Sequence, residues 1–167
     1  EELKSFRFNP HVAQLKQLAK ILPFTLTSAQ ERVFREIQAD MVTSRPMNRL
    51  VQGDVGSGKT VVALHALVMA CGSGCQTALM VPTEILAEQH YLNLAPLLRA
   101  VGSKAVRLTS GGKAKDRNET LKQLESGAAQ IAIGTHAVIQ KKVRFANLGL
   151  VIVDEQHKFG VLQRKTL

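Results

Sequence analysis

The chain has 167 residues, of which 45% are hydrophobic, which is enough for one globular domain with a core on both faces of a sheet. No apolar run reaches the roughly 18 residues that a membrane-spanning helix needs, and the first residues lack a signal-peptide pattern, so we expect a soluble, intracellular protein. The 22 basic and 13 acidic residues give a net charge of +9, which favours a polyanionic partner.

The first predicted element is an amphipathic helix over residues 10–22, which Pro23 ends. Thr27 and Gln30 then have the spacing of a capping box for a second helix that runs on to Met41. Capping alone would explain both residues. However, the ring of Phe24 and the amide of Gln30, shortly before a glycine-rich turn, also suit an adenine pocket, with the ring stacking on the base and the amide pairing with its edge.

The glycine-rich turn follows a short predicted strand at residues 49–52 and precedes a predicted buried helix over residues 61–70. Its G-x-x-x-x-G-K-T spacing is that of a P-loop, in which glycines let backbone N–H groups surround phosphate oxygens. Lys59 would reach the β- and γ-phosphates, and the Thr60 hydroxyl would ligate Mg²⁺ at the positive end of a helix. The predicted phosphate-binding residues are Gly53, Asp54, Val55, Gly56, Ser57, Gly58, Lys59 and Thr60.

A second strand over residues 77–81 leads into a helix that opens at Pro82 and Thr83. We expect Pro96 to kink or end that helix.

A third strand over residues 104–109 precedes a flexible basic loop at residues 110–115, and a helix follows that ends near Gly127. The loop, which contains Gly111, is a candidate phosphate contact, although lysines in such a loop are equally well explained as solvated.

A fourth strand over residues 130–133 runs into Gly134, Thr135 and His136, at the end of the strand where open α/β sheets place their ligands. Thr135 would also serve simply as the cap of the next short helix.

The last strand, at residues 150–153, runs into Asp154 and Glu155, which is a Walker B pattern. Asp154 would hold Mg²⁺ directly or through water, and Glu155 would polarise the attacking water. Paired acids at a strand end are often merely solvated, but their position downstream of a P-loop favours an NTPase. Five strands alternating with helices predict an α/β fold with a doubly wound, mainly parallel sheet.

These motifs resemble those of superfamily 2 helicases over nearly the whole chain. The resemblance is carried by GDVGSGKT as motif I, PTEILAEQH as motif Ia, the GTH segment and DEQH as motif II. Longer stretches look like the RecG family of bacterial ATP-dependent DNA helicases: PFTLTSAQERVFREI, PMNRLVQGDVGSGKT, IGTHAVIQ and VDEQHKFGVLQR. The transcription-repair coupling factor shares several of these segments, and it remains the alternative, together with a DExH RNA helicase and a non-catalytic nucleotide-binding module.

The resemblance implies a bacterial, cytoplasmic and nucleoid-associated translocase that uses ATP and Mg²⁺ to remodel branched double-stranded DNA, such as stalled forks and Holliday junctions. Residues 1–23 would form a lead-in helix, and residues 24–167 would form part of the first RecA-like ATP-binding domain. By position, adenine would be contacted by Phe24 and Gln30, the DNA backbone by Thr83, Gly111, Thr135 and His136, and hydrolysis would be coupled to DNA by Gln156 and His157.

The sequence departs from the family pattern in two places. Lys158 stands where the family more often has Arg, and residues 110–112 match the family's usual loop sequence only loosely. By resemblance, the motor also needs a second RecA-like domain with an arginine finger, a wedge domain that grips the junction, and a motif III strand between the P-loop and Walker B strands. We therefore expect a sheet with a vacant central position and near-basal ATP hydrolysis by this chain.

Overall fold

The computed structural model describes residues 8–42, 59–140 and 142–154, and helices alternate with strands from α3 onward in the described residues. The helices are α1 (Ala13–Ile21), α2 (Ser28–Met41), α3 (Lys59–Gly72), α4 (Glu84–Ala100), α5 (Ala114–Ser126) and the 3-10 helix η1 (His136–Ile139). The strands are β1 (Gln76–Met80), β2 (Ala105–Leu108), β3 (Ile131–Gly134) and β4 (Leu148–Val153). The strand predicted at residues 49–52 lies outside the described residues.

The four described strands form one parallel sheet in the order β2-β3-β1-β4. Met80 is level with Gly134 and with Val153, and Gly134 is level with Leu108. The last residues of all four strands therefore lie along one edge of the sheet, and the predicted parallel α/β architecture is confirmed. The expected vacancy between the P-loop and Walker B strands remains a prediction, because the P-loop strand is outside the described residues.

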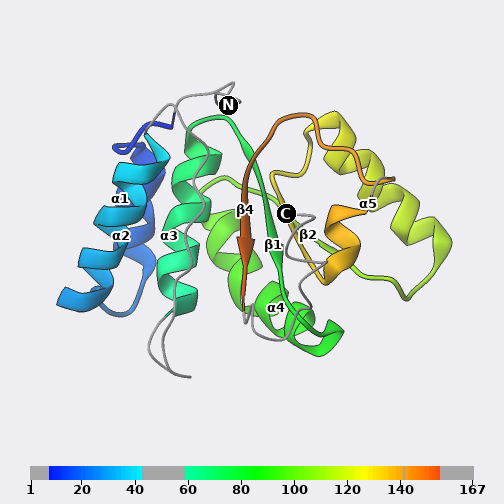
Figure 1. Ribbon diagram of the computed structural model, residues 1–167, viewed down its shortest axis with the longest axis horizontal. Helices are drawn as coiled ribbons and strands as arrows, with labels where there is room; N and C mark the ends of the chain where they lie inside the picture. The colour runs from blue at the N-terminus through cyan, green and yellow to red at the C-terminus, as the bar shows by residue number, and fades with distance from the viewer. Residues whose placement is uncertain (1–7, 43–58, 141, 155–167) are drawn as a thin grey trace.

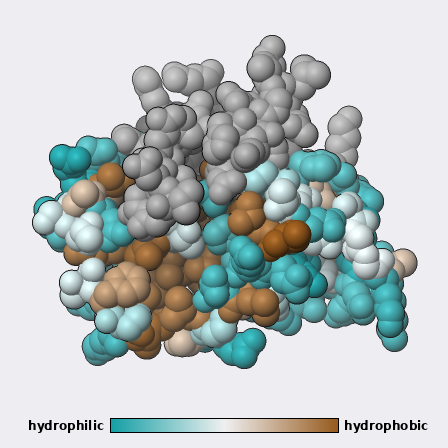
Figure 2. Space-filling view, turned by 90° about the horizontal axis from the view of Figure 1, so that it is seen from below, coloured by the Kyte–Doolittle hydropathy of each residue, from teal (hydrophilic) through white to brown (hydrophobic). Residues whose placement is uncertain are grey.

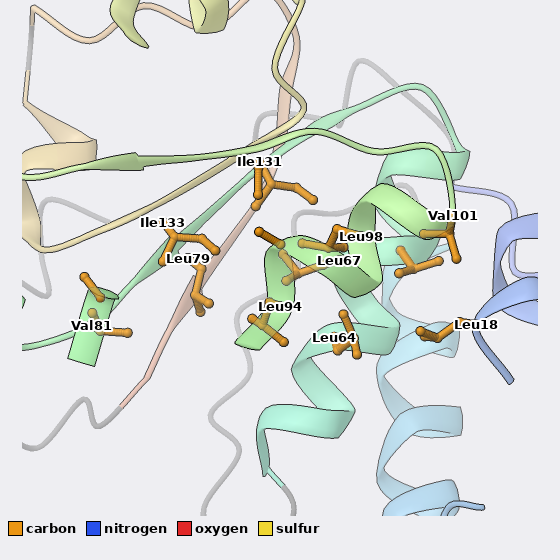
Figure 3. Close-up of a cluster of buried hydrophobic side chains, with 14 residues drawn as sticks. Leu18, Leu64, Leu67, Leu79, Val81, Leu94, Leu98, Val101, Ile131 and Ile133 are labelled. Atoms are coloured by element: carbon orange, nitrogen blue, oxygen red, sulfur yellow. The ribbon is translucent and has the colours of Figure 1, made fainter. Parts of the chain in front are cut away.

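Helices cover both faces of the sheet (Figure 1). On one face α3 packs against β1 and β4, α4 packs against β2 and β3, and α1 packs against α3. Figure 3 shows apolar side chains from these elements converging on one another. They belong to a core cluster that includes Leu18, Leu64, Leu67, Leu79, Val81, Leu94, Leu98, Val101, Ile131 and Ile133. Helix α2 packs against the outer side of α3 through a second cluster, in which Phe34, Ile37 and Met41 meet Val62 and Met69.

The opposite face carries α5 and η1 and has a smaller core. Helix α5 contributes one buried residue, Leu124, to a cluster with Met80, Leu108 and Val138. A polar side chain adds to this packing: Gln76 of β1 is buried and donates hydrogen bonds to the carbonyl oxygens of Leu124 and Ala129, at 2.8 Å each. Its Oε1 accepts a third bond from the backbone N–H of Asn147 at 2.7 Å. One side chain thus joins β1 to the end of α5 and to the segment that leads into β4.

Two helix ends test the local sequence signals. Gly127 caps α5 in the left-handed conformation, with φ of 84°, as the prediction of a helix ending there requires. At Pro96, where a kink or an end was expected, an end is wrong, because α4 continues to Ala100, and the kink remains a prediction. Leu94 and Leu98 on either side of the proline are buried in the core, and this packing outweighs the missing backbone donor.

Candidate functional site

The residues predicted to face ligands lie at the edge where the strands end. Thr83 follows β1, Gly111 follows β2, His136 follows β3, and Asp154 follows β4 directly. The backbone N–H of Asp154 donates to the Met80 carbonyl at 2.8 Å, which extends the β1–β4 pairing by one residue. Open α/β sheets usually bind ligands at this edge, which makes it the candidate site. Figure 2, seen from below, shows hydrophilic residues across its right-hand side and hydrophobic residues left of centre.

The nucleotide side of the site is described in part. Helix α3 is described from Lys59 onward, and Thr60 is half-buried. The predicted phosphate-binding residues 53–58 lie outside the described residues, as do Glu155, Gln156, His157 and Lys158.

Asp154 is on the same face of the sheet as α3. Side chains alternate along a strand, and Ile152, two residues earlier, packs in the cluster that α3 and α4 cover. A threonine hydroxyl and an aspartate carboxylate are oxygen donors of the kind that Mg²⁺ prefers, so the chemistry of Thr60 and Asp154 fits the predicted ion.

Asp154 also contacts the last residue of the PTEILAEQH stretch, to which the sequence motifs assign no role. Its Oδ2 lies 3.0 Å from Nε2 of His90 in α4, and both side chains are mostly buried. A sequence signal for this position exists: His90 is a polar residue on the helical stripe of Ala87, Leu94 and Leu98, which are buried. Such a histidine points inward, but the spacing along α4 does not say which residue it meets.

The predicted DNA-facing residues after β1 and β2 are close together. Thr83 is exposed and caps α4 by accepting a hydrogen bond from the backbone N–H of Leu86 at 3.2 Å. Glu84 follows Thr83 in the chain, and its Oε1 accepts a hydrogen bond from Ser110 Oγ at 2.8 Å. A Cβ added to Gly111 would lie 3.8 Å from the same carboxylate. The loop after β2 therefore lies against the first turn of α4.

A groove of about 430 Å³ lies between the start of α4 and the start of α5. Basic and acidic side chains are mixed along it, and Arg107 pairs with Glu88 at 3.3 Å. The lining residues are Glu84, Ile85, Glu88, Arg107, Leu108, Thr109, Gly111, Gly112, Lys113, Asp116, Arg117 and Thr120. The phosphate contact predicted for this loop remains a prediction.

The segment after β3 is tightly packed. A Cβ added at Gly134 would collide with the backbone carbonyl oxygen of Leu108, so β2 and β3 approach closely only because this residue is glycine. Thr135 precedes η1 but its side chain makes no capping hydrogen bond, so the alternative of a simple cap does not hold. Thr135 is buried, whereas His136 is exposed.

The predicted adenine-binding segment shows the capping box. Thr27 Oγ1 accepts from the backbone N–H of Gln30 at 3.2 Å, and Gln30 Oε1 accepts from the backbone N–H of Thr27 at 2.9 Å. The ring of Phe24 is 49% exposed, as a ring that stacks on a base would need to be. The capping role is therefore confirmed, and the adenine role of Phe24 and Gln30 remains a prediction.

None of the helices in residues 8–42, 59–140 and 142–154 combines the length and the apolar character that crossing a membrane requires.

Comparisons with known proteins agree with this geometry. A sequence profile of the DEAD/DEAH box helicase family matches residues 27–167. The chain is 48% identical, over all 167 residues, to the ATP-dependent DNA helicase RecG of Synechocystis sp., of which it covers 20%. It is 56% identical over 154 residues to the RecG protein of Bacillus subtilis, which is 92% of this chain and 23% of that protein.

A solved structure of RecG bound to a three-way DNA junction superposes with a TM-score of 0.85 at 43% identity, covering 95% of this chain and 22% of that one. The chain spans about a fifth of the length of the curated relatives it matches. The profile match covers most of the residues, and the predicted resemblance to RecG-type helicases is confirmed. The chain belongs to the DEAD/DEAH box helicase family.

Proposed function

We propose that this chain is the ATP-binding motor domain of a RecG-type helicase that moves on double-stranded DNA and remodels branched junctions. The observation that carries the proposal is the common edge of the sheet, where Asp154 and the predicted DNA-facing residues emerge from neighbouring parallel strands. Nucleotide and DNA would then bind at neighbouring positions along the same edge of the sheet. The likeness to RecG bound to a three-way DNA junction supports branched DNA as the substrate.

In this proposal the P-loop residues 53–58 hold the phosphates of ATP, and Lys59 adds a positive charge beside the β- and γ-phosphates. Thr60 and Asp154 would hold Mg²⁺, which neutralises charge on the phosphates when it is bound. Glu155 would orient and polarise the attacking water. Phe24 and Gln30 would contact adenine, and Gln156 and His157 would couple hydrolysis to DNA movement.

DNA would be held mainly through its phosphates, because the chain carries a net charge of +9 and only 4% aromatic residues. Thr83, Gly111 and His136 are exposed at the proposed edge. Thr135 is buried, so its hydroxyl is the least accessible of the four predicted DNA contacts. The second RecA-like domain and the wedge domain remain proposed partners of this domain.

The first test is nucleotide binding. Lys59→Ala should weaken binding of a fluorescent ATP analogue at least tenfold, because the variant loses the cation beside the phosphates. Lys20→Ala, in the last turn of α1, is the matched control and should bind as the original chain does. Equal affinities for the original chain and Lys59→Ala would contradict a P-loop site.

The second test is DNA-stimulated hydrolysis. An arginine finger contributes about 10³ to 10⁵ in rate, so this chain alone should hydrolyse ATP near the basal rate. Phosphate release measured with fork DNA, linear duplex and structured RNA should show little stimulation by any of them. Substantial stimulation by fork DNA would contradict the need for a second motor domain, and preferential stimulation by RNA would point to an RNA helicase.

A further inference from the structure

We propose that His90 is a positioning residue for Asp154, and that it orients the carboxylate for the divalent cation that accompanies the nucleotide. The inference rests on the proposed function, because it takes Asp154 to be the metal-holding aspartate. It adds a residue of α4 to a site otherwise formed by the P-loop helix and the end of β4.

The contact is direct. Nε2 of His90 lies 3.0 Å from Oδ2 of Asp154, within normal hydrogen-bond distance. An ionised carboxylate only accepts hydrogen bonds, so Nε2 carries the hydrogen and donates it. The His90 side chain is 14% exposed and that of Asp154 is 23% exposed, so water competes for this bond less than it does for surface pairs.

Both partners are attached to rigid elements. The residues on the same stripe of α4 as His90, namely Ala87, Leu94 and Leu98, are fully or nearly fully buried in the main core. The backbone of Asp154 is fixed by its hydrogen bond to the Met80 carbonyl oxygen. The bond therefore joins two elements whose positions are already set, and it restricts the rotation of the carboxylate rather than the path of the chain.

An oriented carboxylate suits cation binding, since the ligand does not have to be ordered when the ion arrives. Removing a hydrogen-bond partner of a metal ligand typically lowers metal affinity about 10- to 100-fold. The same bond connects the site to α4, which begins next to Thr83 at the DNA-facing edge. His90 is two helical turns from Thr83, so α4 is a short rigid link between the two.

The plainer interpretation is that His90 only fills space and satisfies its own polar atoms beside the core. In that case its replacement would change stability without changing metal affinity. The two interpretations are separated by measuring the metal and the nucleotide independently.

The experiment uses Mn²⁺ as the probe, with a non-hydrolysable ATP analogue, and follows bound Mn²⁺ by electron paramagnetic resonance. His90→Ala should weaken Mn²⁺ binding in the presence of nucleotide about tenfold or more. Binding of the analogue in EDTA should change less than twofold. His90→Gln, which keeps an N–H donor at a similar reach, should recover part of the Mn²⁺ affinity, and exposed His11→Ala is the matched control.

Unchanged Mn²⁺ affinity in His90→Ala, with nucleotide binding intact, would overturn the inference and leave the proposed function in place. Loss of nucleotide binding in EDTA in both His90→Ala and His90→Gln would also overturn it, because the role would then be structural. If the original chain binds no nucleotide at all, the proposed function fails and this inference fails with it.

Discussion

The two faces of the sheet are held in different ways. On the face of α3 and α4, apolar side chains from α1, α3 and α4 pack against side chains of the sheet, and Leu18, Leu67 and Leu98 are fully buried. On the face of α5, one leucine of the helix is buried and Gln76 supplies three hydrogen bonds. The face that supports the proposed nucleotide site thus depends on close packing, and the opposite face depends partly on polar contacts.

The difference predicts unequal responses to the same truncation. Leu67→Ala should lower the free energy of unfolding by about 3 to 5 kcal/mol, because its neighbours are themselves buried in the main core, which limits how far they can move into the cavity. Leu124→Ala should cost less, about 2 to 3 kcal/mol, because half-buried neighbours such as Leu121 and Phe145 can shift towards the space. Urea denaturation measures both. Exposed Leu92→Ala is the control, with an expected change within about 0.5 kcal/mol.

Equal losses for Leu67→Ala and Leu124→Ala would show that the two faces are packed alike.

Removing the hydrogen bonds of Gln76 should give the next largest loss in the free energy of unfolding. Gln76→Ala should destabilise the fold by about 2 kcal/mol, because the Ala129 carbonyl oxygen and the Asn147 N–H lose the bonds that Gln76 makes to them. The Leu124 carbonyl oxygen keeps the bonds that it accepts from the N–H groups of Gly127 and Ala146. Hydrogen exchange should quicken at the amide of Asn147, which loses its acceptor. Exposed Gln17→Ala should change neither quantity. Unaltered exchange at Asn147 in Gln76→Ala would mean that the face of α5 does not depend on this residue.

The smallest expected effect is a pH dependence of stability that comes from His65 in α3. Burial lowers the pKa of His65 below its usual 6.5, while its bond to the Val61 carbonyl oxygen partly offsets the shift. The folded state therefore disfavours the charged ring. The contribution of neutral His65 to the free energy of unfolding is fully present above pH 6.5. It should be lost as the pH falls from 6.5 through the lower pKa of His65 in the folded state.

Urea midpoints at several pH values, compared between the original chain and His65→Gln, would measure this effect. The fall in midpoint between neutral and mildly acidic pH should be smaller in His65→Gln, and exposed His11→Gln should behave like the original chain. The same pH dependence in His65→Gln would assign the effect to other groups.

Features that depend on near neighbours in the chain were predictable from sequence. The capping box at Thr27 and Gln30, the start of α4 after Thr83 and the end of α5 at Gly127 follow from side-chain and backbone chemistry within four residues. The four described strands also follow from their apolar runs and from the turn residues that flank them.

Features that depend on distant parts of the chain were not predictable. His90 meets Asp154 across 64 residues, and Gln76 bonds to Ala129 across 53. Neither separation leaves a local pattern, because a single sequence does not say which surfaces pack together. Pro96 shows the converse: a strong local signal to end a helix was outweighed by burial of Leu94 and Leu98.

The glycine at position 134 has a consequence for mutational scans of this family segment. Because any side chain there would push against the Leu108 carbonyl, substitutions would separate β2 from β3 and displace the loops that follow both strands. Under the proposed function, a loss of DNA affinity in such a variant would report on strand spacing rather than on a lost contact. Substitution of exposed His136 would therefore test its proposed DNA contact directly, whereas substitution of Gly134 would not.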